Sequence, residues 1–196
     1  LTRSSNAKKE MIPIDQIEYD SENPRIQNIF DLGREKNEAN IKIALGHSTP
    51  DEDSRQGTTF RGLRNSIQAN KGIIHPIIIQ KIDTTKYIVV EGNTRLMIYK
   101  EFKERNYDGD WERIPSYVYD KIDEGEVDAI RLQSHLVGPR QWSPYAKARY
   151  LAALQKKDYI TWDTIISFCG GDQRSLEQSI SSYYDMETHY KKIVED

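Results

Sequence analysis

A strand that leads through a glycine directly into a helix is the feature that most limits how this chain can fold. Two β-branched stretches, 77–82 and 87–90, are separated by the turn residues 83–86, which predicts a β-hairpin. Gly92 follows the second strand, and the apolar residues after it recur at helical spacing. Residues 93–105 are therefore predicted to form a helix that begins almost where a strand ends.

The start of this helix is also the best candidate for an anion site. The first N–H groups of a helix have no partner within it, and the helix dipole favours a negative charge beside them. Arg95 adds a guanidinium group whose planar fork suits phosphate oxygens. Glu91 could hold a metal ion or orient a water molecule, which makes it a candidate catalytic residue. The interpretation requires an open site. It fails if neighbouring side chains fill the site or if Arg95 is held in an internal ion pair.

The distribution of charge agrees with a local anion site. The chain of 196 residues has a net charge of −3, yet residues 61–105 hold 9 basic and 4 acidic side chains. One positive segment in an acidic protein suits a local site better than a surface that coats nucleic acid. A solvated basic helix face would give the same numbers, and it remains the alternative.

Patterns on either side of the hairpin add further strands and helices. Residues 11–17 are expected to form a short edge strand, because Pro13 needs a strand side without a partner. Gly72 is expected to end the preceding helix in a left-handed conformation. The other expected segments are a weak helix at 34–45, a polar loop at 46–59, a helix from residue 60 and a strand at 114–119.

From residue 123 onward, only helices are expected. They cover 123–136, a segment from Pro144 to about 157, a segment opened by Thr161 and a last helix capped by Asp172. The predicted fold class is α+β, a small mixed sheet with helices followed by an all-helical module. The predicted domains are a flexible or tag-derived segment 1–10, a mixed domain 11–122 and a helical module 123–196, with a possible helix-turn-helix at 161–184.

The last helix offers candidate DNA contacts. In a helix-turn-helix, the start of the second helix reads base edges and phosphates. The residues expected there are Gln173, Arg174, Ser175 and Gln178. Residues 142–196 hold 7 basic and 8 acidic side chains, which argues against tight unassisted binding. An ordinary helical hairpin that covers the core is the alternative.

Several classes of protein are disfavoured. The single cysteine, Cys169, excludes a disulfide framework and a multi-cysteine zinc site. The histidines are too dispersed for metal-ligand spacing, so no structural metal is expected. No apolar run is long enough to cross a bilayer, so no membrane association is expected. The expected location is the cytoplasm.

Four blocks of sequence, in order, resemble the ParB N-terminal domain family, which is related in fold to sulfiredoxin. The resemblance covers roughly residues 11–155. The blocks are Ile12-Pro-Ile-Asp-Gln-Ile17 with Asn23-Pro-Arg25; Gly62-Leu-Arg-Asn-Ser-Ile67 with Gly72-Ile-Ile-His-Pro-Ile77; Tyr87 to Val90 with Glu91-Gly-Asn-Thr-Arg-Leu96; and Ile114-Pro115 with Trp142-Ser-Pro144.

The resemblance implies a ParB-like protein, also described as a nuclease-like domain, of plasmid, phage or other mobile-element origin. In that family two loops hold a nucleoside triphosphate, usually CTP. Carried over, CTP or ATP with Mg²⁺ would lie at loops 72–76 and 92–95. DNA is the implied partner, and a homodimer is possible. The residues implied to line the nucleotide site are Gly72, His75, Pro76, Gly92, Asn93, Thr94 and Arg95.

Departures from the family pattern leave other functions open. Residues 92–95 keep only the outer two members of the family's Gly-Glu-Arg-Arg turn. Its Glu-Asn-x-x-Arg segment begins here with His135, which removes a carboxylate that would help to hold Mg²⁺. His135 could contact phosphate or act as a base, or it could simply bond the last carbonyls of a helix. The alternatives to nucleotide and DNA binding are a nuclease or phosphotransfer enzyme that uses Glu91, and a protein-interaction adaptor with a degenerate pocket.

Overall fold

The computed structural model describes residues 7–24, 26–30, 33–47, 60–134, 144–169 and 172–195. The chain separates into two compact units, Leu1–Arg131 and Leu132–Asp196. The first unit holds a sheet and helices, and the second is helical, so the predicted α+β fold class is confirmed. Among the described residues, no helix is both long enough and apolar enough to span a membrane.

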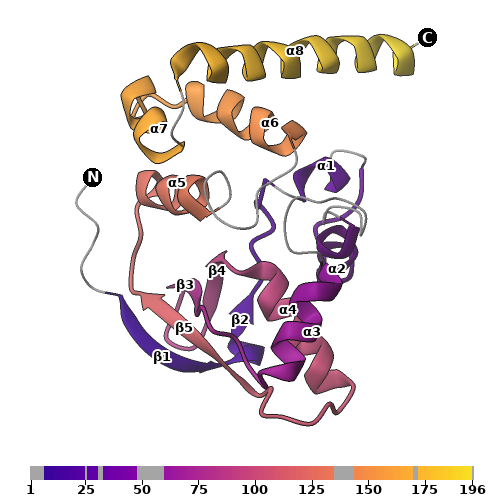
Figure 1. Cartoon of the computed structure of the whole chain (residues 1–196), viewed down its shortest axis with the longest axis vertical. Coiled ribbons are helices and arrows are strands. Elements are labelled where there is room, and N and C mark those ends of the chain that lie inside the picture. The colour runs from indigo at the N-terminus through magenta and orange to yellow at the C-terminus, as the bar shows by residue number, and fades with distance from the viewer. Residues whose placement is uncertain are drawn as a thin grey trace. The chain divides into compact units, whose positions relative to one another are not determined.

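The order of elements follows the sequence pattern closely (Figure 1). The strands are β1 (Lys8–Pro13), β2 (Ile17–Glu18), β3 (Ile77–Lys81), β4 (Tyr87–Glu91) and β5 (Arg113–Tyr119). The α-helices are α1 (Gln27–Phe30), α2 (Glu38–His47), α3 (Phe60–Ala69), α4 (Asn93–Glu104), α5 (Glu124–Leu132), α6 (Pro144–Gln155), α7 (Trp162–Cys169) and α8 (Gln173–Glu195). A short 3-10 helix, η1 (Ile14–Gln16), separates the first two strands.

The sheet has the order β1-β5-β3-β4-β2 and mixes both strand directions. β1 pairs antiparallel with β5 and β2 pairs parallel with β4, so the two strands form opposite edges. The single edge strand expected at 11–17 is therefore two edge strands joined by η1. Pro13 ends β1, as an edge position allows. β1 begins at Lys8, inside the segment that was expected to be flexible.

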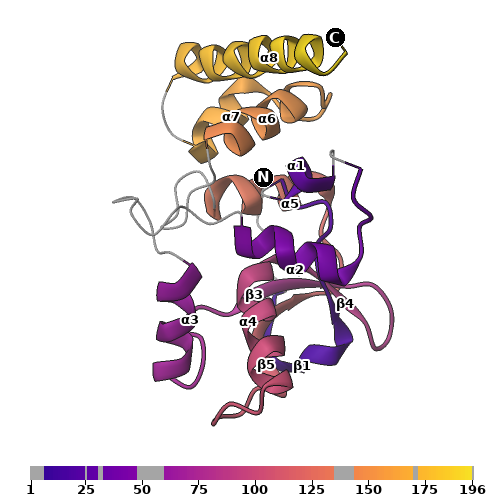
Figure 2. The same ribbon diagram turned by 90° about the vertical axis from the view of Figure 1, so that its right-hand side faces the viewer.

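The hairpin and the helix after it are confirmed. β3 and β4 pair antiparallel, and α4 begins two residues after β4 ends. Figure 2 shows α4 alongside the sheet. One face of the sheet buries Ile77, Ile79 and Val89 in the same cluster as Leu96 and Phe102 of α4. Burial of this apolar surface is what fixes α4 against the strands.

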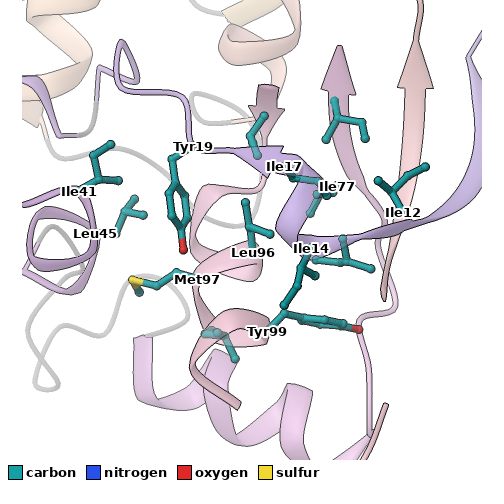
Figure 3. Close-up of a cluster of buried hydrophobic side chains, with 14 of the residues drawn as sticks. Ile12, Ile14, Ile17, Tyr19, Ile41, Leu45, Ile77, Leu96, Met97 and Tyr99 are labelled. Atoms are coloured by element: carbon teal, nitrogen blue, oxygen red, sulfur yellow. The ribbon is translucent and has the colours of Figure 1, made fainter. Parts of the chain in front are cut away.

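Tyr19 is an unusual member of this core. Its ring extends between Ile41 and Leu45 of α2 and Leu96 and Met97 of α4 (Figure 3). The residue is 7% exposed, and no described group hydrogen-bonds to its hydroxyl. Burial raises the pKa of Tyr19 well above its ordinary value, so the phenol stays neutral.

Two local predictions were wrong. The left-handed residue after α3 is Lys71, with φ 47°, and Gly72 has no left-handed φ. The N–H of Gly72 instead bonds the carbonyl of Ile67, which closes the end of the helix. The loop expected from residue 46 also begins later, because α2 runs through His47. The rest of that loop, 48–59, lies outside the described residues.

In the second unit, α6 packs beside α8, as both views show (Figures 1 and 2). Leu151, Leu154 and Ile180 are buried between these helices. The predicted helix starts are confirmed: α6 begins at Pro144, the hydroxyl of Thr161 accepts the N–H of Thr164, and the carboxylate of Asp172 accepts the N–H of Ser175. The last helix is longer than expected and continues to Glu195.

Candidate functional site

Gly92 is required at the turn between β4 and α4. Its φ is 115°, a left-handed value that other residues rarely adopt. A Cβ atom at this position would also collide with Ile77, because it would lie 2.8 Å from the Cβ of that residue and closer still to its Cγ2. The turn is therefore tight and filled on one side by a side chain from β3.

Arg95 brings the two predicted loops together. One nitrogen of its guanidinium donates to the carbonyl of His75 and to the carbonyl of Pro76, the latter at 3.1 Å. The side chain is 15% exposed. Loops 72–76 and 92–95 thus meet at one cation, as the sequence interpretation requires of a shared site.

The same guanidinium is not open. Its other terminal nitrogen forms a salt bridge with the carboxylate of Glu91, whose side chain is 17% exposed. The expectation of an open anion site at Arg95 is therefore wrong, and a phosphate could reach this guanidinium only by displacing Glu91. The reason is local: Glu91 ends β4 and Arg95 lies in the first turn of α4, so the tight Gly92 turn carries the two side chains toward each other.

Asn93 and Thr94 do not face solvent either. They are buried at 3% and 6% exposure. The side chain of Asn93 accepts the N–H of Asp20 at 3.0 Å and donates to the carbonyl of Asp20 at 3.1 Å. This pair of bonds joins a third segment, the turn after β2, to the start of α4. Asn93 is therefore a positioning residue in this structure.

Asp20 connects the turn to α5 as well. One oxygen of its carboxylate accepts the N–H of Glu22 at 2.9 Å, and the other forms a salt bridge of 2.5 Å with Arg131. Burial raises the pKa of the Asp20 carboxyl, and the nearby Arg131 guanidinium lowers it in part. The sequence interpretation did not include Asp20 or Arg131. The partners are 111 positions apart, so no local pattern links them.

The loop before β3 is held at one point and exposed elsewhere. The N–H of Ile73 donates to the hydroxyl of Tyr99 at 3.2 Å. His75 is exposed, Gly72 and Pro76 are half-buried, and Ile74 is 77% exposed. Of the residues predicted to line the nucleotide site, His75 is thus the side chain most available to a ligand.

The remaining candidates lie elsewhere. The candidate DNA contacts are exposed on the first turns of α8: Gln173, Arg174, Ser175 and Gln178. The side-chain amide of Gln173 donates to Glu177 at 2.6 Å. His135 lies outside the described residues, as does the turn 170–171. Within the described ranges, no three histidine, cysteine or carboxylate side chains gather in a group that could hold a metal ion.

Comparisons with known proteins find similarity at the level of structure. No protein-family model matches the chain, and no curated protein matches it. C-terminally truncated ParB from Caulobacter crescentus, solved with CTP-γ-S, is 18% identical, with 88% of this chain and 76% of that chain covered and a TM-score of 0.40. The same protein solved with the centromeric parS site is 17% identical, with coverages of 87% and 69% and a TM-score of 0.48.

A Pnob8-like ParB-N domain is also similar, at 19% identity, with 77% of this chain and 44% of that chain covered and a TM-score of 0.43. The chain is therefore similar in structure to ParB N-terminal domains, at low sequence identity. This likeness concerns the fold, and the function rests on the residues of the site.

Proposed function

We propose that this chain is a ParB-like, DNA-associated protein that binds a nucleoside triphosphate, CTP or ATP with Mg²⁺, at loops 72–76 and 92–95. The observation that supports this most directly is that Arg95 bonds the carbonyls of His75 and Pro76. The family resemblance implies that both loops bind phosphate, and here they meet at the guanidinium of Arg95, beside the start of α4. Arg95, once Glu91 is displaced, would hold the phosphates beside that helix start.

A specific observation favours a second candidate, the adaptor with a degenerate pocket. Arg95 is already paired with Glu91, and Asn93 and Thr94 are buried. An adaptor needs no open phosphate site, so a permanently closed turn would suit it. The two candidates differ in whether any nucleotide stabilises the protein.

The nucleotide proposal predicts a thermal shift. In the presence of Mg²⁺, CTP or ATP should raise the melting temperature of the full chain. At a ligand concentration about a hundred times the dissociation constant, the gain in unfolding free energy is about 2.7 kcal/mol. GTP should be scanned alongside to define the base preference.

Arg95→Lys is the matched variant for this measurement. Lysine keeps the charge but lacks the planar fork, so the shift should shrink while much of the local charge balance is retained. Arg95→Ala is less suitable because it also removes the bonds to His75 and Pro76. Each variant is compared with its own unliganded melting temperature. If no nucleotide shifts the wild type, the nucleotide proposal is wrong and the adaptor is favoured.

The DNA part of the proposal predicts that Arg174→Ala weakens retention of the full chain on DNA. Arg174 is exposed in the first turn of α8, and loss of one such contact should reduce affinity roughly 5- to 150-fold, which corresponds to about 1–3 kcal/mol. Retention of the wild type should fall steeply with salt, since phosphate contacts release counterions. Binding is measured by fluorescence anisotropy over a salt series.

Lys147→Ala is the control for charge, because it removes one positive charge from α6 instead of α8. Equal losses in the two variants would show a nonspecific effect of net charge. Retention that is unchanged in Arg174→Ala would contradict a role for the start of α8.

A further inference from the structure

Glu91 and Arg95 face each other across the Gly92 turn from fixed positions. The backbone of Glu91 belongs to β4, where its register partner is Ile78. The strand pairing shifts between Ile78, which pairs with Glu91, and Ile79, which pairs with Val89, so the irregularity lies at Val90, directly before Glu91. Irregularities of this kind redirect side chains next to functional sites. Because α4 fixes Arg95 and β4 fixes Glu91, the salt bridge can open only by rotation of the side chains.

The carboxylate of Glu91 occupies the position beside Arg95 that a phosphate group of the proposed ligand would take. One terminal nitrogen of Arg95 is committed to two neutral carbonyls. The other meets Glu91. Carboxylate and phosphate oxygens accept the same charge-assisted hydrogen bonds from a guanidinium group. A phosphate that takes up the second nitrogen must therefore displace Glu91.

Displacement opposes binding for two reasons. The side chains of Glu91 and Arg95 are only 17% and 15% exposed, so a charge left there without its partner costs more than one at the surface. A released carboxylate would also remain close to the arriving phosphates and repel them. Both effects lower the affinity of the wild type below that of the same site without the carboxylate.

We infer that Glu91 is an internal counter-anion that closes the Arg95 site and that an anionic ligand must displace it. The inference rests on the proposed nucleotide function and adds a form of regulation to the same site. Glu91 therefore limits affinity in the wild type. It also ensures that Arg95 is neutralised whenever the ligand is absent.

The test compares wild type and Glu91→Gln for binding of CTP, ATP and inorganic tripolyphosphate by isothermal titration calorimetry. Glutamine keeps the shape of the side chain and removes the charge. The variant should bind about tenfold more tightly, since a tenfold change corresponds to about 1.4 kcal/mol. The same gain with tripolyphosphate as with nucleotides would place the effect at the phosphates.

Glu18→Gln is the matched control, because Glu18 lies on β2 in an exposed pair with Lys86. The affinity of Glu18→Gln for each of the three ligands should equal that of the wild type. Equal gains in both variants would overturn the inference in favour of a general charge effect. Weaker binding by Glu91→Gln only when Mg²⁺ is present would overturn it in favour of a metal ligand. Loss of phosphate release with unchanged affinity would overturn it in favour of a catalytic base.

The outcomes also separate the inference from the proposed function. If the wild type binds and Glu91→Gln binds no more tightly, only the inference fails. If neither protein binds any of the three ligands, the nucleotide proposal fails and the inference fails with it. Binding by Glu91→Gln alone would support closure of the site by Glu91, while the proposal that the wild type binds a nucleotide would fail.

Discussion

Gly92→Ala should lower the stability of the first unit by roughly 2–5 kcal/mol. Alanine at a φ of 115° is strained, and its methyl group would overlap the side chain of Ile77. The expected loss combines both effects. Urea unfolding, with hydrogen exchange in β3 and β4 as the report on the first unit, measures the change.

Gly72→Ala is the control for this substitution. A Cβ at Gly72 would lie 3.5 Å from the hydroxyl of Tyr99, which is an ordinary contact, and the position has no left-handed φ. The substitution should change stability by no more than about 1 kcal/mol. Equal effects at the two glycines would contradict the account of the Gly92 turn.

Arg131→Met should destabilise the first unit by about 3–5 kcal/mol at neutral pH, because it leaves the carboxylate of Asp20 buried without its cation. Asp20 is 3% exposed, so water cannot replace the lost partner. Adding Asp20→Asn should recover most of the loss, since asparagine keeps an acceptor for the N–H of Glu22 and carries no charge. Lys86→Met breaks the exposed pair with Glu18 and should cost less than about 1 kcal/mol.

The loss in Arg131→Met should depend on pH. Burial raises the pKa of Asp20 in the folded wild type, and Arg131 partly offsets this. Without Arg131, the folded-state pKa of Asp20 rises further. At acid pH the carboxyl is protonated in both folded and unfolded chains, so the charge penalty disappears. As pH rises through the raised pKa, the unfolded chain releases the proton more readily and the deficit grows. A deficit that is equal at pH 4 and pH 8 would contradict a buried ion pair.

Much of the fold follows from local sequence patterns. The β3–β4 hairpin, the start of α4 after Gly92, and the caps at Thr161 and Asp172 all depend on neighbouring residues, and the structure confirms them. The end of α3 shows the limit of such patterns. Glycine is the usual left-handed residue after a helix, yet here Lys71 takes that conformation, one position earlier.

The candidate site was less accessible from the sequence. Arg95 joins loops 72–76 and 92–95 through its bonds to His75 and Pro76. The closure of Arg95 by Glu91 depends on how two elements direct their side chains across a turn. The role of Asn93 depends on Asp20, 73 positions away. Such contacts are set by tertiary packing, which leaves no periodic signal in the sequence.

The opposite-edge arrangement of β1 and β2 has a consequence for synthesis. Lys8 of β1 pairs with Val118 of β5, so β1 has no partner in the sheet until β5 has emerged from the ribosome. The segment 8–18 completes the two edges of the sheet last, because β1 pairs with β5 and β2 pairs with β4. Contacts so distant along the chain form slowly. The nascent sheet therefore exposes the backbone of β4 and β5 until its own beginning folds back onto it.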